Sequence, residues 1–150
     1  MMIKKVFGAA GIAFVVLCAA GAGARSSTAI DGRPWSDSDD ACFTSENYGV
    51  IANSCGTTKT FRVGGQSDGG GTKTVNMFGR GNGSAATLCV LIATDAPGVT
   101  VSSVGVQTTS ATKTTLLPAN QTVLVPTEGQ IYAHCDVAPG GALSSFRYTP

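Results

Sequence analysis

Apolar and polar residues alternate in short segments along the chain after residue 41, and turn residues separate the segments. The longest apolar run in this part is Ala-Ala-Thr-Leu-Cys-Val-Leu-Ile-Ala-Thr at residues 85–94, and it ends at the turn sequence Asp-Ala-Pro-Gly. A run of this length between turns fits a strand covered on both faces better than a helix. Because side chains alternate along a strand, Cys89 shares a face with Leu91 and lies in the expected core.

Eight further segments have the length, alternation and spacing of strands. They span residues 48–52, 58–63, 72–78, 99–106, 112–117, 122–125, 131–137 and 142–148. The alternation in 131–137 places Cys135 on the apolar face, and Tyr132 and His134 on the opposite face. No window after residue 24 has helical periodicity. The pattern predicts an all-β, jelly-roll-like antiparallel β-sandwich of about eight or nine short strands.

The N-terminus has the pattern of a signal peptide. Lys4 and Lys5 precede an apolar stretch at residues 6–17, and Ala-Gly-Ala at 22–24 is a small-residue cleavage site. We expect cleavage after residue 24, a polar lead-in at 25–40 and one disulfide-stabilised domain at 41–150. The alternatives to a cleaved signal peptide are an uncleaved membrane anchor and a lipoprotein modified at Cys18. If the signal peptide is cleaved, we expect no membrane span in the rest of the chain.

The charged residues argue against a nucleic-acid partner and include one acidic run that could bind a metal ion. Without residues 1–24 the net charge changes from +1 to −1, and no basic patch is present, so we expect no nucleic-acid partner. Asp37, Asp39 and Asp40 form either a solvated acidic run or a calcium site, and the lack of EF-hand spacing favours the former. The glycine-rich residues 79–84 match no dinucleotide or phosphate loop, and we predict no cofactor or metal.

Four cysteines remain after residue 24, at positions 42, 55, 89 and 135. An even number in an exported chain predicts two disulfides, and the spacing does not fit a zinc site. Three pairings are possible. We favour Cys42–Cys55, which brackets one short loop, and Cys89–Cys135, which joins two expected core strands.

Candidate catalytic residues are few. His134 is the only histidine, so a Ser-His-Asp triad would have to use it, but no Gly-x-Ser-x-Gly motif occurs. Glu46 and Glu128 lie in separate expected loops and do not form a recognisable glycosidase pair. We therefore predict a protein that is not an enzyme and has no catalytic residues, with a small secreted hydrolase as the remote alternative.

Three segments resemble short exported β-rich proteins of Gram-negative bacteria, a group without a known function. They are Ser-Thr-Ala-Ile-Asp-Gly at 27–32, Cys-Gly-Thr at 55–57 leading to Phe-Arg-Val at 61–63, and Tyr-Ala-His-Cys-Asp-Val-Ala-Pro-Gly at 132–140. Residues 117–137 are also loosely similar to the closing hairpin of secreted pre-peptidase C-terminal sandwich domains. Neither resemblance implies a catalytic residue.

Two functional hypotheses follow. The first is a secreted, periplasmic or cell-surface protein with a structural or interaction role. The alternative is a small extracellular binding module for a glycan or a protein, whose possible ligand face comprises Trp35, Tyr132, His134 and Tyr148. Trp35 fits either this face or the edge of the core. Clustered, exposed aromatic residues would favour the binding module, and dispersed, buried ones would favour the scaffold.

Overall fold

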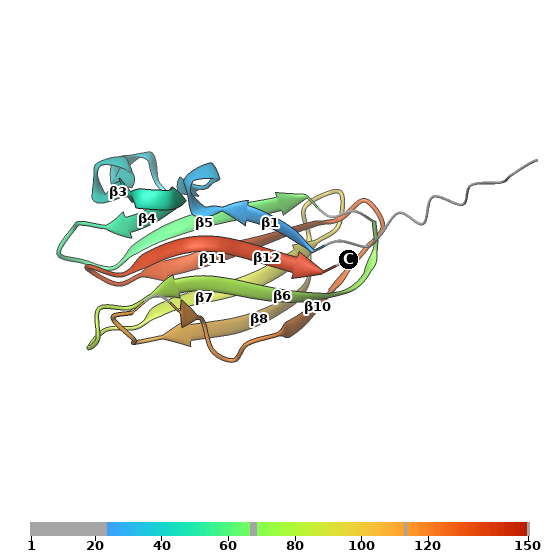
Figure 1. Ribbon diagram of the computed structural model, residues 1–150. Coiled ribbons are helices and arrows are strands. Elements are labelled where there is room, and N and C mark those ends of the chain that lie inside the picture. The colour runs from blue at the N-terminus through green and yellow to red at the C-terminus, as the bar shows by residue number, and fades with distance from the viewer. Residues whose placement is uncertain (1–23, 67–68, 113, 150) are drawn as a thin grey trace, which may run out of the picture.

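The computed structural model describes residues 24–66, 69–112 and 114–149, and the predicted leader, except for its last residue, lies outside this part. Two antiparallel sheets pack face to face, so the predicted all-β sandwich is confirmed (Figure 1). The helical segments are short 3-10 turns, which are η1 (Ala29–Asp31), η2 (Asp37–Cys42) and η3 (Asn47–Gly49).

One sheet has seven strands and the other has five. The seven-stranded sheet contains β1 (Arg25–Thr28), β3 (Phe43–Glu46), β4 (Val50–Asn53), β6 (Gly71–Arg80), β9 (Thr114–Thr115), β10 (Gln121–Val125) and β12 (Ala142–Thr149). The five-stranded sheet contains β2 (Arg33–Pro34), β5 (Lys59–Gln66), β7 (Thr87–Thr94), β8 (Thr100–Thr108) and β11 (Gln130–Val137). Its order is β2-β5-β11-β7-β8, so β11 is the central strand.

Each of the nine segments expected as strands overlaps one of β4 to β12. The segment 25–40, expected to be a polar lead-in, contributes β1 and β2, which pair with β12 and β5. Strand pairing needs only backbone N–H and C=O groups, so a short edge strand can form without an alternating apolar pattern. The sandwich therefore includes residues that lie before the expected domain boundary.

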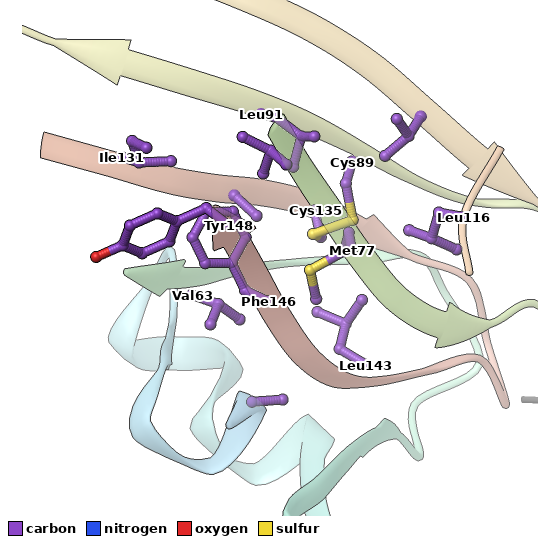
Figure 2. Packing of buried hydrophobic residues seen from close by; sticks show 14 of the residues in the cluster. Val63, Met77, Cys89, Leu91, Leu116, Ile131, Cys135, Leu143, Phe146 and Tyr148 are labelled. Carbon is purple, nitrogen blue, oxygen red and sulfur yellow. A yellow bond between two sulfur atoms is a disulfide. The ribbon is translucent and has the colours of Figure 1, made fainter. Parts of the chain in front are cut away.

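The core lies between the two sheets, and both inner faces supply it (Figure 2). Its largest fully buried side chains include Phe146, Met77, Leu91, Leu116, Ile131 and Leu143. Gly65 lets the sheets approach closely, because a Cβ there would lie 2.9 Å from Cε1 of Phe146. Apolar side chains that alternate on facing sheets thus account for most of the burial.

The structure contains both predicted disulfides. Cys89 and Cys135 are register partners on β7 and β11, and both are fully buried (Figure 2). Their bond therefore joins neighbouring strands of one sheet rather than the two sheets. Cys42, at the end of η2, bonds to Cys55 in the loop after β4.

The expectation that the strand at 85–94 is covered on both faces is wrong. Its inward residues, such as Leu91, are buried, but Leu88 on the other face is 40% exposed. Parallel strands buried on both faces usually have helices packed against them, whereas this antiparallel sheet has no such layer over its outer face in the part of the chain described. The outer face of the five-stranded sheet is thus open to a ligand.

Candidate functional site on the outer face of the five-stranded sheet

Register brings a row of basic residues together on this outer face. Arg33 on β2 is opposite Arg62 on β5, and Arg62 is opposite His134 on β11. In the next row, Gly64 is opposite Tyr132. Because Phe61, Val63, Ala133 and Cys135 between these positions are buried, the row residues on β5 and β11 point away from the core.

Four of the side chains form a compact group, here called the Arg62 cluster: Trp35, Arg62, Tyr132 and His134. The Arg62 guanidinium carbon lies 4.4 Å from the ring centroid of Trp35 and 4.9 Å from that of Tyr132. The Trp35 and His134 rings are 4.9 Å apart and tilted by 52°. Both distances from the guanidinium are within the range of cation–π attraction.

Trp35 follows the two-residue strand β2, and its backbone N–H donates a 3.0 Å hydrogen bond to the Thr60 carbonyl. This bond extends the β2–β5 pairing by one residue and holds the indole at the edge of the sheet. Trp35 is 59% exposed, so it does not anchor the core edge. Its remaining ring surface is accessible to a ligand.

Two shallow hollows adjoin the cluster, and Arg62 lines both. The larger, of about 630 Å³, includes Tyr132 and Gly64 in its lining, and the smaller, of about 290 Å³, includes Trp35 and Arg33. Gly64 contributes to the open space, because a Cβ built there would meet no atom within 4 Å. The surface therefore has two neighbouring depressions, each with one aromatic side chain and a shared guanidinium.

Two other cations among the described residues have carboxylate partners. Lys59 Nζ lies 2.6 Å from Asp39 Oδ1. Arg80 donates two hydrogen bonds to Glu46, of 2.9 and 2.7 Å. These bonds hold the pKa of the Glu46 carboxyl below its usual value.

Arg62 differs, because its Nε is buried and has no hydrogen-bond partner within the described residues. The guanidinium carbon lies near both rings, and the N–H donors of a guanidinium lie in its plane. The cluster thus presents a positively charged hydrogen-bonding edge between two aromatic rings.

The structure brings together three of the four residues of the expected ligand face, namely Trp35, Tyr132 and His134. Including Tyr148 in that face was wrong, because Tyr148 is 3% exposed on β12 of the other sheet. It lies on the same face of β12 as the buried Phe146, two residues earlier, and their rings are 6.0 Å apart in the core (Figure 2).

Sequence reasoning did not include Arg62 in the site. The alternation at 58–63 already placed Arg62 on a polar face, opposite in direction to Phe61 and Val63. The missing information was the pairing of β5 with β11, which puts Arg62 beside His134. A local pattern gives the direction of a side chain but not its neighbour on the next strand.

No metal-ligand cluster and no membrane-spanning helix occurs in the part of the chain that the structure describes. Within residues 24–66, 69–112 and 114–149, no group of three or more His, Cys, Asp or Glu side chains is arranged to hold a metal ion. Asp39 of the acidic run is instead paired with Lys59. No helix in the same part of the chain has the length and apolarity to cross a membrane.

No family model matches the sequence, and no curated protein matches it. Among solved structures, the chain is similar to the CBM36-1 domain of a multidomain xylanase from the hindgut metagenome of Trinervitermes trinervoides. The identity is 11%, the TM-score is 0.54, and the match covers 85% of this chain and 97% of that one. It is also similar to part of the Podospora anserina GH26-CBM35 β-(1,4)-mannanase, with 13% identity and a TM-score of 0.51, over 86% of this chain and 28% of that one.

At such low identity these likenesses show the fold alone, which is a β-sandwich of the kind found in carbohydrate-binding modules. They support the β-rich part of the resemblance drawn from the sequence, but not the likeness to pre-peptidase C-terminal domains.

Proposed function

We propose that the protein is a small, non-catalytic glycan-binding module that works outside the cytoplasm, as a secreted, periplasmic or cell-surface protein. The observation that carries the proposal is the Arg62 cluster, in which the exposed Trp35 and the half-buried Tyr132 and His134 gather around a cation on an uncovered sheet face. Dispersed, buried aromatics would have favoured a purely structural role. This proposal therefore takes the binding-module hypothesis over the structural one.

The chemistry of a sugar ring suits this surface. One face of a pyranose ring is rich in C–H groups and packs on an aromatic ring, while its hydroxyl groups need hydrogen-bond partners around the rim. Tyr132 and Trp35 supply the aromatic surfaces, and Arg62 supplies donors between them. Two adjoining hollows favour an oligosaccharide with at least two neighbouring sugars over a single sugar.

The scaffold holds the site rigidly before a ligand arrives. Tyr132 and His134 lie on β11, the central strand, which is paired on both sides and bonded to β7 through Cys135. A site built on paired strands loses little conformational freedom when it binds, so less of the contact free energy is spent on ordering. The two disulfides also fit a protein that folds in an oxidising compartment.

The fold comparison supports the same proposal. The similar xylanase domain is a carbohydrate-binding module, and the mannanase structure, which is similar over 28% of its chain, contains another. A sandwich of this kind is therefore able to carry a glycan site, although the location of the site in this chain rests on its own side chains.

The test is a glycan array followed by titration calorimetry of the oligosaccharides that bind. We expect Trp35→Ala and Tyr132→Ala each to weaken binding by about tenfold or more, since large aromatic contacts dominate binding free energy. Tyr48→Ala is the matched control. Tyr48 lies in η3 beside the other sheet and is 97% exposed, so we expect its loss to change affinity less than about twofold.

A second pair of variants tests the location of the glycan site without removing a side chain that contacts the ligand. Gly64→Val would fill the larger hollow, whereas Gly105→Val adds the same side chain to β8, three strands away on the same face. A Cβ at either glycine would meet no atom within 4 Å, so both variants should fold. We expect only Gly64→Val to block binding. Failure to bind any glycan, or equal effects of the two variants, would refute the proposal.

A further inference from the structure

We infer that the sugar bound at this site is a uronate, whose carboxylate accepts hydrogen bonds from Arg62. The inference rests on the proposed glycan-binding function and specifies its ligand class. It starts from an incomplete interaction: Arg62 is held between two rings, but its buried Nε lacks a hydrogen-bond partner among the described residues. Because the Nε atom is buried, the donors that a ligand acceptor would reach are the terminal N–H groups of the guanidinium.

The geometry of the donor selects the acceptor. The guanidinium lies within cation–π distance of Trp35 and Tyr132, and its N–H donors form a planar edge. That edge matches a carboxylate, whose two oxygens accept two parallel N–H hydrogen bonds. A neutral hydroxyl would accept a single, weaker bond. The rings also limit the rotation of the guanidinium, so that little side-chain entropy is lost on binding.

The surrounding charge favours an anion as well. Arg33, Arg62 and His134 form one row across three adjacent strands, where neighbouring strands are about 4.8 Å apart. Like charges directly opposite each other destabilise a sheet unless a counter-charge lies near them. The Arg33–Arg62 pair is therefore a local excess of positive charge in a chain with few charged residues.

The nearby acidic groups leave one place for the ligand carboxylate. Asp37 lines the smaller hollow together with Arg33, and Asp136 on β11 accepts a 2.8 Å hydrogen bond from Thr60. The described lining of the larger hollow, in contrast, contains Arg62 and Tyr132 and no acidic residue. We therefore place the uronate ring against Tyr132 in the larger hollow, with its carboxylate at the Arg62 edge.

The experiment compares one sugar with and without its charge. Calorimetry is performed with galacturonate oligomers, with the same oligomers as methyl esters, and with mannuronate and glucuronate oligomers. Neutral galactose and xylose oligomers and a sulfated glycan complete the panel. We expect at least one uronate to bind about tenfold or more tightly than its methyl ester or neutral counterpart. We also expect the affinity for that uronate to fall with added salt, because salt screens the charge.

Variants assign the preference to Arg62. Arg62→Gln should abolish the difference between acid and ester, and Arg62→Lys should restore only part of it, because an ammonium group lacks the planar fork. Arg147→Gln removes an exposed cation from β12 of the other sheet and should leave the difference unchanged. Circular dichroism and melting temperature establish that each variant is folded.

The possible outcomes separate this inference from the function on which it rests. Equal affinity for a uronate and its methyl ester, or binding of neutral glycans alone, overturns the inference that the ligand is a uronate. The proposal of a glycan-binding module would stand in either case. If the sulfated glycan binds and no uronate does, the inference that the ligand group is a carboxylate is overturned. Binding of no glycan at all overturns both proposals.

Discussion

At the scale of single residues, Asn53 holds one end of the sandwich together. It is 1% exposed at the end of β4, and its Nδ2 donates hydrogen bonds of 2.8 Å to the Val137 carbonyl and 2.9 Å to the Thr57 carbonyl. Its Oδ1 accepts a 3.0 Å bond from the Cys55 backbone N–H. One amide thus links the end of β11 to the loop that carries the Cys42–Cys55 disulfide.

We predict that Asn53→Ala lowers the free energy of unfolding by about 2 to 4 kcal/mol, because it leaves buried backbone groups without partners. Urea unfolding with the disulfides intact measures this change. Asn76→Ala is the control. Asn76 exchanges two exposed hydrogen bonds with Asn120, and its loss should cost less than about 1 kcal/mol. Equal costs for the two variants would contradict the role given to Asn53.

At this scale, the sequence predicted the direction of a side chain where alternation within one strand was sufficient. The outward direction of Tyr132 and His134 follows from the buried residues between them on β11. It failed for Tyr148, because that residue ends the last expected segment, and the mixed pattern before it, Ala-Leu-Ser-Ser-Phe-Arg, does not distinguish the faces. The preference for Trp35 as an anchor of the core edge was wrong, since Trp35 is exposed and β2 is too short to show a pattern.

At the scale of elements, the two disulfides close loops of different length. Cys42 and Cys55 are 13 residues apart, whereas Cys89 and Cys135 are 46 apart and tie the two strands next to the site. In the chain-entropy model the longer loop contributes about 4 kcal/mol and the shorter about 3 kcal/mol, because the longer bond restricts the unfolded chain more. The Cys89–Cys135 bond is also fully buried, so removing it leaves a cavity.

We therefore predict that replacing both Cys89 and Cys135 by alanine lowers the melting temperature more than replacing both Cys42 and Cys55. Differential scanning calorimetry of the two double variants gives the comparison. Glycan titration of the Cys42/Cys55 variant is a useful companion, because Cys42 ends η2, which begins two residues after Trp35, so the titration tests whether this bond helps to hold the Trp35 ring. The reverse order of melting temperatures would show that the buried bond contributes less than the model states.

Elements with an apolar face were predictable, and those held by backbone pairing alone were not. The strands β4 to β12 carry alternation or an apolar run between turns, which the burial of one face explains. The segments β1, β2 and β3 have mainly polar residues and were missed as strands. Their formation depends on which free edge lies nearby, and that is a property of the assembled sheets.

At the scale of the whole molecule, the sequence specifies a sandwich but not the order of its strands. The turn spacing and period-two pattern were sufficient for two packed antiparallel sheets. The site depends on β11 lying between β5 and β7, which are distant from it in sequence. Many strand orders bury the same apolar faces, so the position of Arg62 beside Tyr132 required the structure.

The pairing of β1 with β12 determines how the molecule responds to a pulling force. Arg25 lies opposite Tyr148 at one end of this antiparallel pair, and Thr28 lies opposite Ser145 at the other (Figure 1). A force applied to Arg25 and Tyr148 loads the hydrogen bonds one after another, so the two strands should unzip at low force. A force applied to Arg25 and Ser145 loads all the bonds of the pair together in shear, and we expect it to require a higher rupture force in an optical trap. Because Ser27 of β1 also lines the larger hollow, unzipping this pair would change the lining of the proposed site.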